Sequence, residues 1–124
     1  MKFYKCNLCG NIIDVVHDGG GPLVCCGAEM ALLVPNTVEA STEKHLPEVT
    51  KTECGLHVKV GSVAHPMEDA HYIDFICIKS SKGVARVSLK PGAAPEADFC
   101  LCNYEGTVEV YEYCNLHGLW KTEI

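Results

Sequence analysis

The chain has 124 residues, 48% of them hydrophobic and 21% charged, so it can bury a core and wholesale disorder is excluded. Ten basic against sixteen acidic residues give a formal net charge of −6, which argues against nucleic acid as a partner. No apolar run approaches the roughly 20 residues that cross a bilayer, and the N-terminal segment lacks an apolar signal-peptide core. We therefore expect a cytoplasmic protein with no membrane partner. In such a reducing compartment, its nine cysteines and six histidines favour metal ligands over disulfides.

Residues 1–36 are expected to form a small unit that a metal ion holds together. The segment carries four of the nine cysteines and a run of three glycines, Gly19–Gly21, which cannot continue a helix or a central strand. Its apolar stretches, such as Ile12-Ile13, are too short for an independent core. Units of this size normally need a metal or disulfide staple.

The four cysteines of this segment have the spacing of a metal site. The two-residue gap between Cys6 and Cys9 lets both sulfurs turn onto one ion. Cys25 and Cys26 are adjacent, and neighbours in a strand point to opposite sides, so both reach one ion only with a local twist of the backbone. Four thiolates select zinc or iron, and the spacing does not separate these metals. A pair of disulfides is the weaker alternative because a vicinal Cys25–Cys26 bridge is strained.

Residues 37–47 are expected to be a polar linker that leads into a second unit over residues 37–124. This unit contains short runs in which apolar and polar residues alternate, separated by glycine and proline turns. Such runs predict an all-β antiparallel sandwich or small barrel, and no window predicts a helix. Inward-facing positions are expected at Leu56, Val58 and Val60, and a shared face at Ile73, Phe75 and Cys77.

A cysteine and four histidines of the second unit form a second candidate metal site. Cys114 and His117 lie three residues apart at a predicted turn, while His45, His65 and His71 lie in loops or at strand ends. Structural zinc is satisfied by four ligands, so four imidazoles with one thiolate favour a redox metal, iron above all. Five protein ligands leave a sixth octahedral position for a small molecule, and a thiolate opposite that position would push electron density towards it. The alternative gives each histidine a separate surface role.

Glu43 and Lys44 directly precede one of these histidines. The ammonium group of Lys44 can attract a small anion despite the negative net charge, because the local potential matters more than the total. The carboxylate of Glu43 can occupy the open metal position when no substrate is bound. The alternative is an ordinary solvated charge pair.

Together these motifs resemble the desulfoferrodoxins, the two-iron form of superoxide reductase. The resemblance covers nearly the whole chain. It includes Cys6-x-x-Cys9 with Cys25-Cys26, the segments 43–47, 61–68 and 114–118, and the shorter segments 90–92 and 95–97.

The resemblance implies a desulforedoxin-like module over residues 1–36 and an immunoglobulin-like antiparallel β-sandwich over residues 37–124, with two iron ions per chain. The first iron would be held in a rubredoxin-like centre, where zinc is the alternative, and the second in the sandwich. The ligands implied for the first are Cys6, Cys9, Cys25 and Cys26; for the second they are His45, His65, His71 and His117 in a plane, with Cys114 axial.

The reaction implied by the resemblance is the one-electron reduction of superoxide to hydrogen peroxide at the second, ferrous iron. Lys44 would draw superoxide to the open position, and Glu43 would cap the ferric iron until an external donor reduces it. Rubredoxin is the usual donor in the family, and its members are commonly homodimers.

Four further cysteines depart from the family pattern. Cys77 is expected to be a small core residue. Cys100 and Cys102 share a strand face, where they would lie at a subunit interface or be exposed and oxidisable; Cys54 has no assigned place.

Two other functions compete with the reductase interpretation. A pure electron carrier would use the four-thiolate site alone and needs no open metal position. A zinc-stabilised binding module would be colourless and would show no redox change.

Overall fold

The computed structural model describes residues 1–38, 40 and 42–124. It divides into two compact units, Met1–Val34 and Pro35–Ile124. Within the described residues, no helix has the length and apolar character needed to span a membrane.

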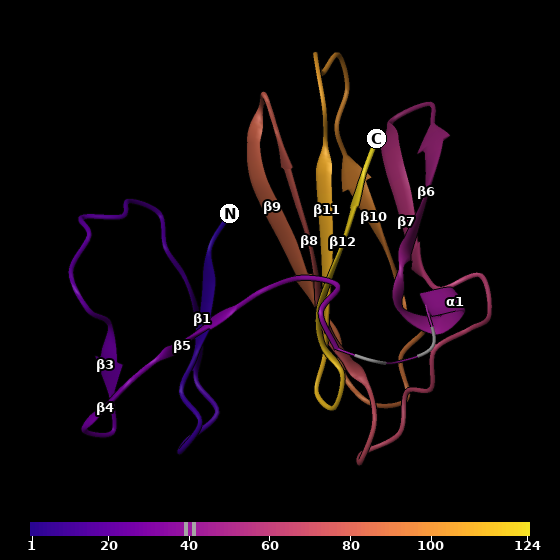
Figure 1. Ribbon diagram of the computed structural model, residues 1–124. Helices are drawn as coiled ribbons and strands as arrows, with labels where there is room; N and C mark the ends of the chain where they lie inside the picture. The colour runs from indigo at the N-terminus through magenta and orange to yellow at the C-terminus, as the bar shows by residue number, and fades with distance from the viewer. Residues whose placement is uncertain (39, 41) are drawn as a thin grey trace. The chain divides into compact units, whose positions relative to one another are not determined.

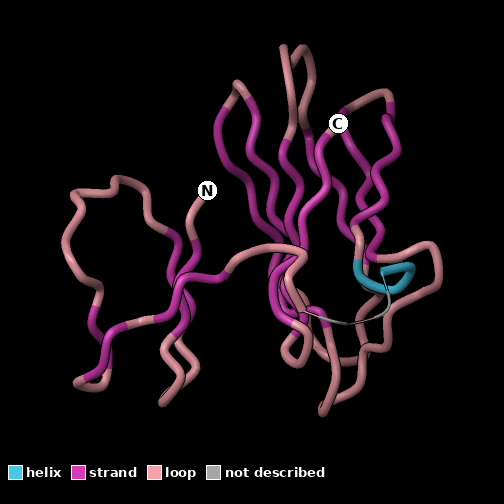
Figure 2. Tube along the Cα trace, viewed as in Figure 1, coloured by secondary structure: helices cyan, strands magenta, loops and turns pink. Residues whose placement is uncertain are grey.

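The first unit consists of short antiparallel strands (Figures 1 and 2), and few of its side chains are buried. Its three-stranded sheet has the order β2-β1-β5, and β3 pairs with β4 in a separate hairpin. Phe3, Cys6 and Met30 are its buried residues. The strands are β1 (Phe3–Lys5), β2 (Ile12–Asp14), β3 (Val24–Cys25), β4 (Ala28–Glu29) and β5 (Ala31–Leu33).

The second unit is a sandwich of two antiparallel sheets, which confirms the all-β fold class (Figure 1). Across the described residues one sheet has the order β10-β7-β6 and the other the order β12-β11-β8-β9, the three-plus-four arrangement of immunoglobulin-like domains. Its elements are α1 (Thr42–His45), β6 (Pro47–Thr52), β7 (Gly55–Val60), β8 (Ile73–Ser80), β9 (Gly83–Ser88), β10 (Glu96–Cys100), β11 (Glu109–Cys114) and β12 (Gly118–Glu123).

The hydrophobic core lies between these two sheets. In β7 the expected alternation is confirmed: Leu56, Val58 and Val60 are buried, whereas His57 and Lys59 are partly exposed. They pack with buried residues of β8, β10 and β11 in one cluster. Each fully buried aliphatic side chain contributes about 1.5–3 kcal/mol, and every residue of this cluster belongs to the second unit.

The prediction that Ile73, Phe75 and Cys77 share one face of β8 is wrong, because the strand contains a bulge. Cys114 pairs with Ile73 but Tyr113 pairs with Phe75, which leaves Asp74 without a partner in the register. Ile73 therefore points into the core, while Phe75 and Cys77 point to the opposite face, where the Phe75 ring stacks on Tyr113. A bulge reverses the alternation of side chains beyond it.

The segment expected to be a linker contains a four-residue helix, α1, that the sequence did not predict. A single helical turn is too short to produce an apolar stripe. This turn carries Glu43, Lys44 and His45, and only His45 is buried.

Candidate functional site

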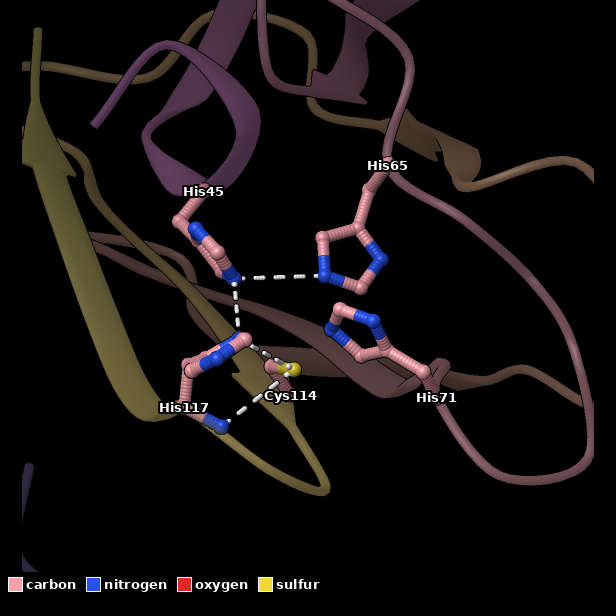
Figure 3. A group of neighbouring side chains, drawn as sticks. All are labelled: His45, His65, His71, Cys114 and His117. Carbon is pink, nitrogen blue, oxygen red and sulfur yellow. Dashed lines mark hydrogen bonds between the residues drawn. The ribbon is translucent and has the colours of Figure 1, made fainter. Parts of the chain in front are cut away.

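Four histidines and one cysteine converge at one end of the sandwich (Figure 3). They are His45, His65, His71, Cys114 and His117, and their ligand atoms all lie within 4.8 Å of one another. The cluster expected from the sequence is therefore present in full. His45 comes from α1, His65 and His71 from the loop between β7 and β8, Cys114 from the end of β11 and His117 from the turn that follows.

The β11–β12 hairpin presents Cys114 and His117 together. Cys114 pairs with Gly118, so only three residues form the turn, and Gly118 has the positive φ of 75° that closes it. The backbone N–H of His117 donates to Sγ of Cys114 over 3.4 Å. Trp120 Nε1–H donates to the His117 carbonyl over 3.1 Å, and the Trp120 ring stacks on His45. Both interactions fix ligand rings.

The β7–β8 loop fixes the orientation of His65 and His71. Nδ1–H of His65 donates to the Pro66 carbonyl over 2.7 Å, which leaves Nε2 with the lone pair that a metal needs. Asn115 holds the other end of the loop: its Nδ2 donates to the Ala70 carbonyl over 3.0 Å, and its Oδ1 accepts from Tyr72 N–H over 2.9 Å. These two bonds bracket His71.

The distances between the ring nitrogens fit a shared metal ion. Nε2 of His45 lies 3.0 Å from Nδ1 of His117 and 3.2 Å from Nε2 of His65. Two nitrogens bound at right angles to one ion at about 2.1 Å would lie about 3.0 Å apart. Nε2 of His71 is buried and has no hydrogen-bond partner among the residues that the structure describes. A buried nitrogen of this kind needs a partner, and a metal ion satisfies it.

Burial favours the neutral form of two of the imidazoles, His65 and His71, and neutral imidazole is the form that binds a metal. Burial lowers the pKa of His65 to about 4. Burial also lowers the pKa of His71, and the positive charges of His117 and Lys44 act in the same direction. Burial raises the pKa of the Cys114 thiol, with a smaller contribution from the carboxyl group of Glu112, so a bound cation is needed to stabilise its thiolate.

One side of the cluster faces solvent. Cys114, His45 and His65 are buried, whereas His71 and His117 are partly exposed. Lys44 is exposed, and its positive charge contributes to the lowered pKa of His71. This charge therefore acts on the solvent-facing side of the cluster. Glu43 is exposed next to it, and its carbonyl accepts from Val63 N–H over 3.1 Å. A small anion can therefore approach the cluster from solvent.

Replacing Gly61 by alanine should displace α1 and weaken metal binding at the cluster. Gly61 has a φ of +79°, and a Cβ there would lie 2.6 Å from the Val63 carbonyl oxygen and 2.7 Å from those of Glu43 and Lys44. The backbone must shift, and His45 follows Lys44 directly. We expect metal affinity to fall at least about 10-fold, measured by competition with a chelator. Gly106→Ala is the matched control, since Gly106 has a φ of +73° but open space around it; equal affinities in the two variants would contradict this account.

The four cysteines of the first unit form a second cluster, also as expected. The sulfurs of Cys6, Cys9, Cys25 and Cys26 lie within 4.8 Å of one another. Cys9 and Cys25 are 3.6 Å apart and Cys25 and Cys26 3.9 Å apart. Sulfurs bound tetrahedrally at about 2.3 Å would lie about 3.8 Å apart, so the spacing fits one ion.

The twist expected at the adjacent cysteines is confirmed. Cys26 and Gly27 both have positive φ, 53° and 72°, and form the two-residue turn between β3 and β4. Backbone N–H groups of Cys9 and Leu8 lower the pKa of Cys6 to about 6, whereas the neighbouring thiol groups, Cys9 first, raise the pKa of Cys26 to about 12. A metal ion bound by all four sulfurs would stabilise the four thiolates together, despite their mutual repulsion.

Several residues around the histidine–cysteine cluster could not be recognised from the sequence. Asn115 and Trp120 hold ligands in place, and Gly61 lets α1 approach. Glu112 lies two residues before Cys114 and is fully buried, and its carboxylate oxygens have no hydrogen-bond partner within the described part of the chain. Burial raises the pKa of Glu112 well above its usual range. Only two signals were available in the sequence. Glu112 shares an alternating face of β11 with Val110 and Cys114, and Asn115 lies between the ligands Cys114 and His117.

Comparisons with known proteins agree with this geometry. The family model described as desulfoferrodoxin matches residues 37–123, and the model of the desulfoferrodoxin N-terminal domain matches residues 1–33. A desulfoferrodoxin from Syntrophotalea carbinolica is 54% identical over 123 residues, which are 99% of this chain and 96% of that protein.

Solved structures of similar shape include two superoxide reductases. The one from Treponema pallidum has a TM-score of 0.79 and 35% identity, with 98% of this chain and 97% of that chain covered. The one-iron enzyme from Giardia intestinalis has a TM-score of 0.58 and 30% identity, with 66% of this chain and 97% of that chain covered.

Proposed function

Because this chain belongs to the desulfoferrodoxin family, we infer that it is a superoxide reductase, which reduces superoxide to hydrogen peroxide by one electron at the histidine–cysteine cluster. The observation that carries this function is the convergence of five ligand atoms around one point with a side left open to solvent. A pure electron carrier needs no such opening, and a structural zinc site needs only four ligands.

Iron is the cofactor of both clusters, and the donor atoms fit it. His45, His65 and His71 would bind through Nε2, His117 through Nδ1 and Cys114 through Sγ. The four thiolates of the first unit would hold the second ion, with zinc as the alternative there. When bound at the histidine–cysteine cluster, iron supplies the electron that superoxide takes up, and the thiolate of Cys114 tunes its readiness to do so.

Lys44 is proposed to attract superoxide and to organise its protons. Superoxide carries one negative charge, and the Lys44 ammonium is the positive group whose charge acts on His71 at the open side. A local positive charge raises the encounter rate of a small anion even on an acidic protein. Two protons complete hydrogen peroxide, and the ammonium can hold the water molecules that deliver them.

Glu43 is proposed to close the open side between turnovers. It shares one helical turn with Lys44 and His45, so its carboxylate is tethered close to the cluster. A carboxylate is a good ligand for an oxidised, more highly charged metal ion. Its position on α1, two residues before His45, supports this role.

Electrons must come from outside the chain, and we propose a small iron–sulfur protein such as rubredoxin as their donor. The four-cysteine unit resembles such a carrier in its ligands, which supports a role in electron entry. A homodimer and a cytoplasmic location complete the proposal; all nine cysteines lie in the described residues and none forms a disulfide there, which suits a reducing compartment.

The reductase function predicts a definite stoichiometry. Iron-loaded, pre-reduced protein mixed with superoxide should give one hydrogen peroxide per superoxide consumed and no oxygen, because one electron and two protons are added. Rapid-mixing absorption, peroxide assay and metal analysis measure this. Zinc-loaded protein is the control and should not react. Iron that superoxide fails to oxidise, or a native protein that holds only zinc, would contradict the function and favour one of the two rivals.

A further inference from the structure

Three cysteines lie outside both metal clusters and are exposed at one end of the sandwich. Cys54 lies in the turn between β6 and β7, Cys100 ends β10, and Cys102 follows two residues later. They are free thiols in the structure. No step of the proposed reduction uses them. Exposed thiols close to one another are open to oxidation, unlike the buried Cys77.

The backbone holds Cys54 and Cys102 next to each other. Sγ–H of Cys102 donates to the carbonyl oxygen of Cys54 over 3.2 Å, and Leu101 N–H donates to the same oxygen over 3.2 Å. A carbonyl oxygen lies about 2.4 Å from its own Cα, so the sulfur of Cys102 is within about 6 Å of the Cys54 Cα. Formation of an S–S bond from this position requires the Cys54 side chain to rotate towards Cys102.

Gly55 shows how closely the two segments approach. A Cβ at this residue would lie 2.0 Å from the Phe99 carbonyl oxygen and 2.4 Å from the Leu101 nitrogen. The β6–β7 turn is therefore pressed against the end of β10 with no room for a side chain between them. The pairing of β7 with β10 ends at Gly55 and Cys100, and the two hydrogen bonds to the Cys54 carbonyl continue the contact beyond it.

Cys100 has a different neighbourhood. It borders a shallow hollow of about 110 Å³ together with Lys82 and Val84 of the β8–β9 hairpin, and neither Cys54 nor Cys102 lines that hollow. It has the exposure and the chemistry of Cys102, two residues earlier in the chain, but lacks the contact with Cys54. This makes Cys100 a built-in control.

These thiols lie far from the histidine–cysteine cluster. Strand β7 begins at Gly55, beside Cys54, and ends at Val60, beside the loop that leads to His65. Five residue steps at about 3.3 Å give roughly 17 Å between its ends. Figure 1 shows the β6–β7 turn at the opposite end of the strands from α1. Changes at the thiols therefore leave the metal ligands untouched.

We propose that Cys54 and Cys102 are a peroxide-oxidised dithiol, which forms a disulfide that ties the β6–β7 turn to the segment after β10. This inference rests on the proposed function only for its oxidant, since hydrogen peroxide is the product released by the same molecule. The disulfide closes a loop across the edge strand of the three-stranded sheet, so it stiffens that end of the sandwich.

The chemistry balances in two steps. The thiolate of one cysteine attacks the peroxide, an S–O bond forms as the O–O bond breaks, and the hydroxide that leaves takes up a proton to become water. The thiolate of the other cysteine then attacks the sulfenic sulfur, an S–S bond forms, and a second water leaves. Two thiols and one hydrogen peroxide thus give one disulfide and two waters, and an added dithiol reverses the change.

The test uses the iron-loaded full chain and reagent hydrogen peroxide in modest excess. Exposed thiols are then blocked with an alkylating reagent, and linkages are mapped by mass spectrometry. We expect the loss of two of the three exposed thiols outside the metal clusters, a mass decrease of two hydrogen atoms and a Cys54–Cys102 peptide pair. Cys54→Ser and Cys102→Ser should not form this pair, whereas Cys100→Ser should form it as the unchanged protein does.

Other linkages would overturn the proposal: a Cys100–Cys102 bridge, a bridge between two chains, or sulfinic acid without any disulfide. A second arm replaces reagent peroxide by superoxide, with and without catalase, and separates this inference from the proposed function. A disulfide with reagent peroxide but not with superoxide would support the dithiol and count against the reductase. If neither arm gives a disulfide while superoxide is still consumed, the dithiol proposal is overturned and the proposed reductase function is not.

Discussion

Replacing Cys114 by serine should remove the reaction with superoxide while leaving the sandwich folded. Cys114 is fully buried at the base of the cluster, and its sulfur accepts from the His117 N–H. A serine hydroxyl is almost the same size but does not ionise, so it gives the metal far less electron density. We expect the rate constant to fall more than about 100-fold, a larger effect than typical changes next to a metal ligand. Stopped-flow absorption measures it.

The visible spectrum gives a second readout of the same variant. A thiolate bound to oxidised iron absorbs through transfer of charge from sulfur to metal, and this band should disappear in Cys114→Ser. Cys77→Ser is the matched control because Cys77, in β8, is buried like Cys114 but is not part of the cluster packed between the sheets. The control should keep both band and rate. A Cys114→Ser protein with the unchanged band would show that this sulfur is not a ligand.

Replacing Lys44 by alanine should slow the reaction and flatten its dependence on salt. The Lys44 charge acts on His71, on the solvent-facing side of the cluster where superoxide is proposed to arrive. Steering by a local charge changes association rates by about 10-fold or more at low ionic strength and fades as salt screens it. We expect about a 10-fold lower rate at low salt and a much smaller difference at high salt, measured by rapid mixing.

Two further variants separate steering from a general charge effect. Lys44→Arg should keep most of the salt dependence because the charge stays in place. Lys82→Ala removes the same charge from the β8–β9 turn and should leave the rate unchanged. If Lys44→Ala behaves like Lys82→Ala, Lys44 has no part in attracting the substrate.

The ligands could be predicted from the sequence to different degrees. The pairs Cys6/Cys9 and Cys114/His117 are local, since a two-residue gap brings both side chains to one side of a turn. His45 and His65 belong to segments that only the folded sandwich brings together, so spacing alone could not join them. The resemblance to a family supplied that link, and the structure brings their ring nitrogens 3.2 Å apart.

The supporting residues were not predictable in the same way. Asn115 acts through two hydrogen bonds to a loop that lies 45 and 43 residues earlier in the chain, and an asparagine in a turn is otherwise unremarkable. The bulge at Asp74 leaves no mark in the apolar pattern, because β8 is buried on both faces beyond it. Helix α1 is one turn long, and its single buried residue cannot define a periodicity.

The distribution of the ligands over the two sheets has a mechanical consequence. His45 and His65 flank the three-stranded sheet, and Gly61 locks their segments together. The other sheet supplies Cys114 and His117 directly and positions His71 through Asn115. An ion that binds all five is thus a covalent-like cross-link between the layers, beside the buried ring of Trp120. Antibody domains have a disulfide between the two sheets, packed against a buried tryptophan. In this protein the reactive metal would also connect the two sheets and so stabilise the sandwich.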